Sequence, residues 1–252
     1  KKHLGQHFLT DENIAKKIVE GLDFQPYQYV LEVGPGTGVL TKYLLEKPTE
    51  TYVAEIDTES IEYLKLHFQK LENKHFTGDF LKINLNDIFS GEVAIIGNFP
   101  YNISSQILFK IIENYQQIPE MVGMFQKEVA ERTAAVPRTK DYGILSVLVQ
   151  AYYDVKYLFT VHENVFNPPP KVKSGVIKLT RNRKEGLEGN EILFKQIVKT
   201  GFGQRRKKLS NALKSLDIPE VLKSHAFMDK RAEELSVEDF INFTQEWKAA
   251  KN

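Results

Sequence analysis

The chain has 252 residues, 42% of them hydrophobic and 27% charged, which allows one large globular domain or a domain with an appendage and argues against disorder. It contains no run of 18 apolar residues and no secretory signal pattern, so we expect no membrane span and a cytoplasmic location. The absence of cysteine excludes disulfides, thiolate metal sites and thiol nucleophiles.

Charge is distributed unevenly along the chain. Residues 1–170 hold 16 Lys and Arg against 22 Asp and Glu, whereas residues 171–252 hold 18 against 11. The net charge of +1 therefore conceals an acidic first part and a basic C-terminal part. Lys and Arg bind polyanions by releasing condensed counterions. A solvated basic face would give the same count, so charge alone leaves both interpretations open.

The first two-thirds of the chain alternate between strand-like and helix-like patterns. Short apolar runs rich in β-branched residues predict strands at 29–33, 51–56, 93–98, 121–125 and 155–161. Between them, apolar residues recur at helical spacing, for example at 39–47, 60–72 and 104–115. This alternation predicts an α/β fold in which a parallel sheet carries helices on both faces.

The pattern changes after residue 170. One more strand is predicted at 175–180, and beyond a charged segment the patterns are helical, at 191–202, 205–216, 219–227 and 236–247. Ser236 followed by Asp239 is typical of a helix N-cap with an acidic first turn. We therefore predict an α/β domain over residues 1–183 and a small all-helical domain over residues 184–252.

The first βα turn carries a glycine motif. In LEVGPGTG, Gly34, Gly36 and Gly38 follow a strand and precede a helix, where glycine permits a tight turn and lets a ligand approach backbone N–H groups. The spacing G-x-G-x-G, with Glu32 two residues before the first glycine, differs from the G-x-G-x-x-G pattern of dinucleotide-binding folds. It favours S-adenosylmethionine (SAM) over a nicotinamide cofactor.

Acidic residues extend this predicted pocket. Glu55 lies at the end of the second strand, 21 residues after Gly34, where an acid can accept hydrogen bonds from ribose hydroxyls. Asp79 follows a short apolar segment that would be the third strand, and its carboxylate could accept from an adenine amine, with Phe80 beside it. Taken singly, an aspartate at such a place is more often a turn or N-cap residue.

The run at 93–98 ends in GNFPYNIS. An adenine amine is a poor nucleophile because its lone pair is delocalised, and two acceptors aimed at its N–H groups would favour the pyramidal form. Asn98 could supply one acceptor, and the carbonyl of Phe99, held by the fixed φ of Pro100, the other. Tyr101 could stack on the base. The alternative is a plain loop with a stacking tyrosine. The transfer needs no metal ion.

Five motifs in the same order resemble the ribosomal RNA adenine N6,N6-dimethyltransferase family: GQHFLTDENI (5–14), LEVGPGTG, NFPY, FNPPPKVKSG (166–175) and GFGQRRKKLSNAL (201–213). The resemblance covers almost the whole chain. It implies a Rossmann-like class I SAM-dependent methyltransferase domain over residues 1–183 and an RNA-binding helical domain over residues 184–252. It also implies that two adjacent adenosines in the 3'-terminal hairpin loop of small-subunit rRNA become N6,N6-dimethyladenosine during subunit biogenesis.

The resemblance further implies roles for individual residues. SAM contacts are implied for His7, Leu9, Gly34, Glu55, Asp79 and Asn98, with Gln6, Gly36, Ile56 and Phe80 as neighbours. Phe166 is implied to pack against the target adenine opposite Tyr101, whereas a core plug between two strands is the alternative. The family usually has asparagine at position 7 and leucine at position 99, where this chain has His7 and Phe99.

A basic cluster in the last motif predicts RNA contact. Its members are Arg205, Arg206, Lys207 and Lys208, and further candidates are Arg132, Arg138, Lys140, Lys171 and Lys173. The expected partner is small-subunit rRNA in an immature small subunit, and the chain is expected to act as a monomer.

Four other functions fit part of the sequence. A large-subunit rRNA methyltransferase of the macrolide-resistance type shares the catalytic motifs, but GFGQRRKKLSNAL favours the small-subunit branch. A DNA adenine methyltransferase usually carries a larger recognition region. A non-catalytic ribosome-assembly factor would not need the intact pocket residues. A dehydrogenase leaves NFPY and FNPPPKVKSG unexplained.

Overall fold

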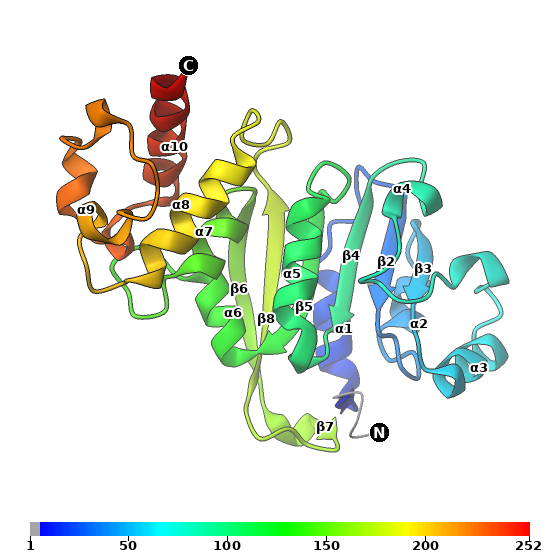
Figure 1. Cartoon of the computed structure of the whole chain (residues 1–252). Coiled ribbons are helices and arrows are strands. Elements are labelled where there is room, and N and C mark those ends of the chain that lie inside the picture. The colour runs from blue at the N-terminus through cyan, green and yellow to red at the C-terminus, as the bar shows by residue number, and fades with distance from the viewer. Residues whose placement is uncertain (1–5) are drawn as a thin grey trace. The chain divides into compact units, whose positions relative to one another are not determined.

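The computed structural model describes residues 6–252, which divide into two compact units (Figure 1). The first unit comprises the chain up to Glu131 together with Asp154–Arg181, and the second comprises Arg132–Tyr153 and Asn182–Asn252. The segment Arg132–Tyr153 thus clusters with the helical C-terminal residues, although it lies within the range predicted for the first domain. The functional division at residues 183 and 184 stays a prediction.

A six-stranded sheet forms the centre of the first unit, in the order β3-β2-β4-β5-β8-β6 (Figure 1). Its strands are β2 (Tyr29–Val33), β3 (Glu50–Ala54), β4 (Val93–Asn98), β5 (Glu120–Gln126), β6 (Tyr153–Val161) and β8 (Ser174–Arg181). The neighbours β3, β2, β4 and β5 run parallel, and β8 runs antiparallel to β5. The six strands predicted from the apolar runs are confirmed. The predicted parallel arrangement is confirmed for β3, β2, β4 and β5, whereas β8 departs from it.

The third strand predicted before Asp79 is wrong. Residues Asn73–His75 form the 3-10 turn η2, and Phe76 then makes only an isolated parallel bridge with Val53. The backbone N–H of Thr77 donates to the carbonyl of Val53 at 3.0 Å. The segment therefore extends the β3 edge of the sheet by one residue pair before the chain turns toward Asp79.

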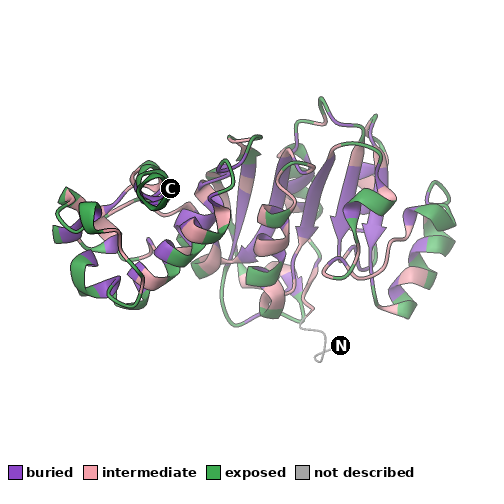
Figure 2. Cartoon of the chain, turned by 45° about the horizontal axis from the view of Figure 1, so that its top comes forward, coloured by how far each residue is buried: buried purple, intermediate pink, exposed green. Residues whose placement is uncertain are grey.

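Helices cover both faces of this sheet. In Figure 1, α1 (Glu12–Glu20) and α5 (Ser104–Glu113) lie on opposite faces. Ile18 and Val19 of α1 pack in one apolar cluster with Ala94 and Ile96, which are two apart in β4 and so share a face. Figure 2 shows the strands as mostly buried and the outer helix surfaces as exposed. The remaining helices of this region are α2 (Thr41–Leu44), α3 (Thr58–His67), α4 (Leu85–Ile88) and α6 (Lys127–Ala134).

The second unit is helical around an aromatic core. Its elements are α7 (Ile144–Gln150), α8 (Glu191–Gly203), α9 (Leu209–Ala212), η5 (Glu220–Leu222), η6 (Ala226–Asp229), η7 (Ala232–Glu234) and α10 (Val237–Lys251). Ser236 caps α10 as predicted, since its hydroxyl accepts the N–H of Asp239 at 3.0 Å and the Asp239 carboxylate accepts the N–H of Ser236 at 2.9 Å. The helix predicted at 205–216 is limited to α9, and 219–227 forms 3-10 turns instead of a helix.

A short two-stranded sheet joins segments that are distant in sequence. β1 (Phe8–Leu9) pairs antiparallel with β7 (Phe166–Asn167), so the N-terminal motif and the proline-containing motif meet. Within residues 6–252, no helix has the length and apolar character that crossing a bilayer requires.

The ring of Phe99 fills a slot that two glycines leave open. Gly97 of β4 and Gly123 of β5 are paired in register, directly beside the end of β4. A Cβ atom added at Gly123 would lie 2.1 Å from Cε2 of Phe99, and one added at Gly97 would lie 2.9 Å from Cε1. Phe99 is buried, so the two missing side chains determine where its ring, and hence the following loop, can lie.

This slot yields a stability prediction. Gly123→Ala should lower the free energy of unfolding by about 1–3 kcal/mol, because it overpacks a buried site. Phe99→Leu in the same chain should restore at least half of that loss, since the shorter side chain vacates the slot. Urea unfolding of the single and double variants measures both effects. A double variant no more stable than Gly123→Ala would show that Phe99 is not what the added methyl meets.

Candidate functional site

Two adjoining cavities lie at the carboxyl ends of β2, β3 and β4. The first, here called the NFPY cavity, is lined by residues that include His7, Leu9, Glu32, Gly36, Asn98 and Tyr101. The second, here called the Asp79 cavity, is lined by residues that include Glu55, Ile56, Asp79 and Phe80. Gln6, Gly34 and Pro100 line both cavities. The structure therefore brings together the glycine turn, Glu55 and Asp79, from which the cofactor site was predicted.

The glycine turn between β2 and α2 adopts the backbone that its sequence predicts. Gly34 and Gly36 have φ values of 68° and 56°, in the left-handed region that favours glycine. A Cβ atom at Gly36 would also lie 2.9 Å from the ring of Phe8. The turn thus depends on glycine both for its conformation and for the close approach of β1.

Glu55 ties the end of β3 to this turn. Its buried carboxylate accepts the N–H of Gly36 at 3.2 Å, of Ile56 at 3.0 Å and of Asp57 at 2.9 Å. An ionised carboxylate offers about four acceptor positions, so one position remains for a ligand hydroxyl. Glu55 as a ribose acceptor stays a prediction that this geometry permits.

Asp79 has the turn geometry that was the alternative to its adenine-binding role. Its Oδ1 accepts the N–H of Leu81 at 3.0 Å, and its carbonyl accepts the N–H groups of Lys82 and Ile83, each at 3.0 Å. The other carboxylate oxygen, Oδ2, accepts no hydrogen bond from residues 6–252. The two roles are compatible, because the turn occupies one oxygen while the other stays available in the Asp79 cavity.

Apolar side chains form part of the lining of the Asp79 cavity. Ile56 is 58% exposed and Phe80 is buried, and both line the cavity. Ile56 thus offers apolar surface that a ligand in the cavity could cover. The pair suits a flat apolar group such as an adenine ring, with Asp79 at its edge.

Lys110 supports the Asp79 turn from α5. Its Nζ donates to the carbonyl of Ile83, where the turn ends, and lies 5.5 Å from the centre of the Phe80 ring. Burial lowers the pKa of Lys110, against the opposing attraction of Asp79 and Glu113. Sequence reasoning missed this residue, whose one signal was its spacing of three from the buried Ile107.

Asn98 is anchored through its amide nitrogen. Its Nδ2 donates to the carbonyl of His7 at 2.8 Å. An amide that donates on one side presents its oxygen on the other, so this bond orients Oδ1 as a free acceptor. The N–H of Phe99 donates to the carbonyl of Met124 at 3.1 Å, while the carbonyl of Phe99 accepts no bond from the described residues. Both predicted acceptors are thus available at the end of β4.

Tyr101 is fixed at both its ring and its hydroxyl. Its hydroxyl lies 2.5 Å from Oγ of the buried Ser174, and its ring centre lies 5.4 Å from that of His7. Burial raises the pKa of Tyr101, so the phenol stays neutral. Nδ1 of His7 contacts the carbonyl of Pro168 at 2.8 Å. A direct SAM contact by the His7 side chain stays a prediction.

Phe166 lies in the core rather than along the cavities. It is 4% exposed, pairs with Leu9 in the β1–β7 ladder and belongs to the apolar cluster of the sheet. This packing matches the alternative interpretation, a plug between two strands. The role of Phe166 on the target adenine stays a prediction.

Two buried polar groups face the NFPY cavity. Oε1 of Gln6 is buried and has no hydrogen-bond partner within residues 6–252, which leaves an acceptor for a donor that this part of the chain does not supply. Glu32 is 1% exposed and accepts a hydrogen bond from Oγ1 of Thr41 at 2.5 Å. Burial, and to a lesser extent the charge of Glu55, raises the pKa of Glu32 to about 8.

These features fit SAM. Its ammonium, ribose hydroxyl and adenine amine groups are donors, and the cavities offer Gln6, Glu55 and Asp79 as acceptors. Within residues 6–252, no group of three His, Cys, Asp or Glu side chains is placed to hold a metal ion.

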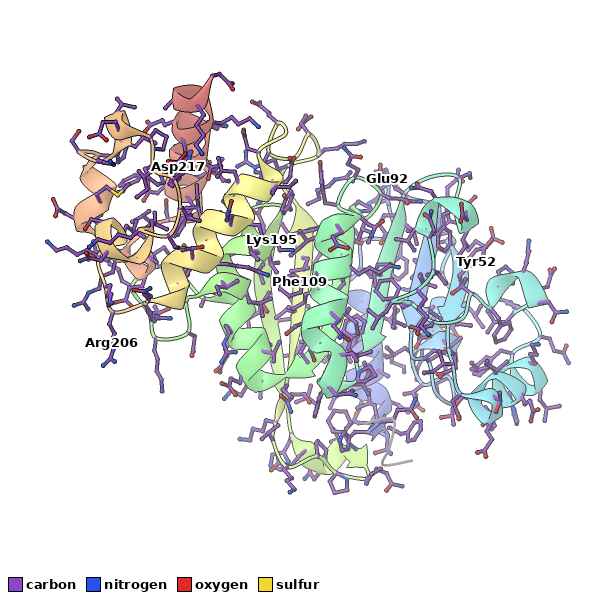
Figure 3. All side chains as sticks on the ribbon, viewed as in Figure 1. Tyr52, Glu92, Phe109, Lys195, Arg206 and Asp217 are labelled. Carbon is purple, nitrogen blue, oxygen red and sulfur yellow. The ribbon has the colours of Figure 1, made fainter. Side chains whose placement is uncertain are left out.

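The predicted RNA-binding cluster is divided by the structure. Arg206, Lys207 and Lys208 are exposed, and Figure 3 shows Arg206 projecting from the second unit. Lys208 also pairs with Asp229 at 3.2 Å. Arg205 differs, because its guanidinium is bonded to three groups inside the second unit. Three donors of Arg205 are thus used inside the second unit, and its RNA contact stays a prediction. The further candidates Arg132, Arg138, Lys140, Lys171 and Lys173 are at least partly exposed.

Comparison with known proteins identifies the family of this chain. A family model described as ribosomal RNA adenine dimethylase matches residues 1–249. The chain is 59% identical to ribosomal RNA small subunit methyltransferase A of Flavobacterium johnsoniae, over 99% of this chain and 96% of that protein. The structure resembles a dimethyladenosine transferase from Plasmodium falciparum, with a TM-score of 0.84, 26% identity and coverage of 97% and 98% of the two chains.

A second solved structure shares the fold. The 23S rRNA methyltransferase ErmE has a TM-score of 0.69 and 24% identity, with 96% of this chain and 99% of that chain covered. The Rossmann-like SAM-dependent methyltransferase fold predicted from the sequence is therefore confirmed.

The support that Lys110 gives to the Asp79 turn can be tested. Lys110→Met should raise the Kd for SAM by about three- to tenfold, because a charged hydrogen bond to the turn is lost. The kcat at saturating SAM should stay unchanged, and Lys110→Arg should recover part of the affinity. Calorimetric titration of SAM measures these values. Lys82→Met is the matched control, since it removes an exposed lysine from the same turn. Equal losses in both variants would contradict the specific role of Lys110.

Proposed function

The chain belongs to the ribosomal RNA adenine dimethylase family and is a SAM-dependent rRNA adenine dimethyltransferase, and we propose that its targets are two adjacent adenosines in the 3'-terminal hairpin loop of small-subunit rRNA. Each adenosine would receive two methyl groups at N6. The observation that supports this chemistry most directly is the end of β4, where two acceptors are free and held in place.

The anchored Asn98 supplies the first acceptor. Because Nδ2 is committed to the His7 carbonyl, Oδ1 can accept one N–H of an adenine amine without rotating away. The carbonyl of Phe99, between the buried ring and Pro100, can accept the other. Two such bonds draw the lone pair out of the ring and onto N6, which makes the nitrogen a better nucleophile.

The protein's remaining task is positioning. SAM supplies the methyl group as an electrophile, since its sulfur is positively charged and leaves as a neutral thioether with the bonding electron pair. For each methyl group, N6 forms one N–C bond and releases one proton. Asn98 and Tyr101 would hold the amine in line for this displacement, and orientation of this kind accounts for a large part of catalytic rate enhancement.

The ring of Tyr101 provides a face for the base. It lines the NFPY cavity and is fixed through Ser174, so a base that stacks on it meets a preorganised surface. Stacking on an aromatic side chain contributes about 1–3 kcal/mol per base. Unpaired loop adenosines reach such a site more readily than bases in an A-form helix, which supports a hairpin loop as the target.

Two observations support the small-subunit target over the large-subunit alternative. The basic motif at 201–213 is the part of the sequence that resembles the small-subunit branch, and the relative at 59% identity carries a small-subunit name. The assembly-factor alternative is not favoured, because the acceptors at the end of β4 and the glycine turn are both intact. We also propose that the substrate is an immature small ribosomal subunit and that the chain acts as a monomer in the cytoplasm.

The substrate proposal predicts where label from SAM will appear. Small ribosomal subunits that lack the modification, and separately large-subunit RNA, are incubated with the chain and methyl-labelled SAM, then digested to nucleosides. We expect label in N6,N6-dimethyladenosine from the small subunit alone. Label only in large-subunit RNA would refute the proposed target. Measurable SAM binding with no label in either RNA would favour the assembly factor.

The acceptor role of Asn98 predicts a separation between binding and turnover. Asn98→Ala should lower kcat by at least about a hundredfold, since it removes an acceptor used in the transition state. The Kd for SAM should rise by no more than about fivefold, because one neutral hydrogen bond to His7 is lost. Single-turnover methylation and calorimetry measure the two quantities. Tyr101→Phe is the control, because it keeps the stacking face. Retention of about a tenth of the turnover or more by Asn98→Ala would contradict the role.

A further inference from the structure

An arginine side chain helps to hold a loop between α6 and α7 to the rest of the second unit. The loop, residues 136–142, is here called the clamped loop. Arg205 follows α8, and its guanidinium donates to Thr139 and Tyr142 carbonyls at 3.0 Å and 2.6 Å and to Oε2 of Glu233 at 3.0 Å. A planar guanidinium that makes three such hydrogen bonds is held rigidly and has few N–H groups left for a ligand from outside the protein.

Further bonds fix the clamped loop against η7. The N–H of Arg138 donates to the carbonyl of Glu233 at 2.9 Å, and the hydroxyl of Tyr142 donates to the carbonyl of Leu235 at 2.7 Å. These contacts hold Arg138 at a φ of 68°. A non-glycine residue in this region is strained, and it persists where surrounding contacts impose it. Here the imposed backbone leaves the Arg138 side chain 69% exposed.

The clamped loop and η7 together line one open pocket with an excess of positive charge. Its charged lining residues are Arg138, Lys140, Arg231, Glu233 and Glu234. Glu233 is neutralised by Arg205, and Glu234 accepts the N–H of Arg231 at 2.7 Å while lying 3.8 Å from the Arg138 guanidinium. The lining therefore carries three cationic side chains and, besides the paired Glu233, one carboxylate, that of Glu234. This arrangement suits an oxyanion with the size and charge of a phosphate.

We propose that this pocket binds a backbone phosphate of the rRNA substrate through Arg138, Lys140 and Arg231, and that Arg205 is a positioning residue which holds the clamped loop for that contact. The inference rests on the proposed function, from which it takes the RNA. It places RNA contact on a loop that is remote in sequence from the 205–208 cluster. Phosphate contacts of this kind set the register of the RNA without reading its bases.

Removal of Glu233 distinguishes a positioning role of Arg205 from direct RNA contact by Arg205. If Arg205 contacted RNA itself, removal of its partner Glu233 would free it and strengthen binding. If Arg205 positions the loop, Glu233→Ala should instead weaken rRNA binding by about five- to tenfold, although the net charge becomes more positive. Asp217→Ala is the matched control, because it removes an exposed acid of the same unit, labelled in Figure 3, that does not line the pocket. It should leave binding unchanged or slightly tighter.

Fluorescence anisotropy with a labelled small-subunit hairpin RNA measures these affinities, and the Kd for SAM checks that the fold is intact. Binding by Glu233→Ala that is as tight as, or tighter than, binding by Asp217→Ala would overturn the positioning role. If thermal melting shows that Glu233→Ala is unfolded, the basic residues of the pocket decide the question alone.

Salt dependence tests the pocket independently. Arg138→Ala with Arg231→Ala should lower the slope of log Kd against log salt by about 0.7–0.9, the value for one lost phosphate contact. Lys214→Ala with Lys248→Ala removes the same charge from exposed positions of the same unit and should leave the slope unchanged. An equal slope for the pocket variant and the wild type would overturn the proposal. The slope does not depend on turnover, whereas missing dimethyladenosine in the wild-type reaction would refute the proposed function.

Discussion

One hydrogen bond joins the N-terminal segment to the end of β4 at the NFPY cavity. Nδ2 of Asn98 donates to the carbonyl of His7, and these residues are 91 positions apart. The bond attaches the N-terminal segment to the end of β4, which closes one side of the NFPY cavity. It also determines which way the Asn98 oxygen points, because an amide has its donor and its acceptor on opposite sides. The same contact therefore shapes the cofactor site and orients the group that would meet the substrate.

Much of the fold could be predicted because strand formation in a buried parallel sheet follows composition. Runs such as YVLEV and VAIIGN are almost continuously apolar, as strands buried on both faces are, and each forms a strand of the sheet at the expected place. The segment before Asp79 was harder, since a bridge of one residue pair leaves no periodic pattern. The stretch 219–227 has the composition of a helix, but it forms the short 3-10 turns η5 and η6, and its sequence shows no signal that separates these from a helix.

The site was predictable where the backbone itself carries the function. Glycines in a tight βα turn and an asparagine at the end of a buried strand are typical of a ligand site, and the structure brings them together. Sequence could not indicate the contacts of side chains whose partners lie far away along the chain. Arg205 belongs to a basic run, and nothing in that run indicates that carbonyls more than 60 residues earlier would take its donors. Phe166 is adjacent to prolines in either role, so only packing separates a core plug from a stacking ring. Lys110 was missed because its acceptor, the carbonyl of Ile83, lies 27 residues earlier, and the spacing of Lys110 from Ile107 does not identify that partner.

The slot between Gly97 and Gly123 has an evolutionary consequence. The volume that Phe99 occupies is the volume that a side chain at position 123 would need, so neither residue can be exchanged freely while the other stays as it is. Substitutions at positions 99 and 123 therefore depend on each other. A lineage that replaced the glycine would pass through an overpacked intermediate unless the ring had shortened first. The order of those substitutions is therefore constrained, and the constraint reaches the loop that carries the chemistry.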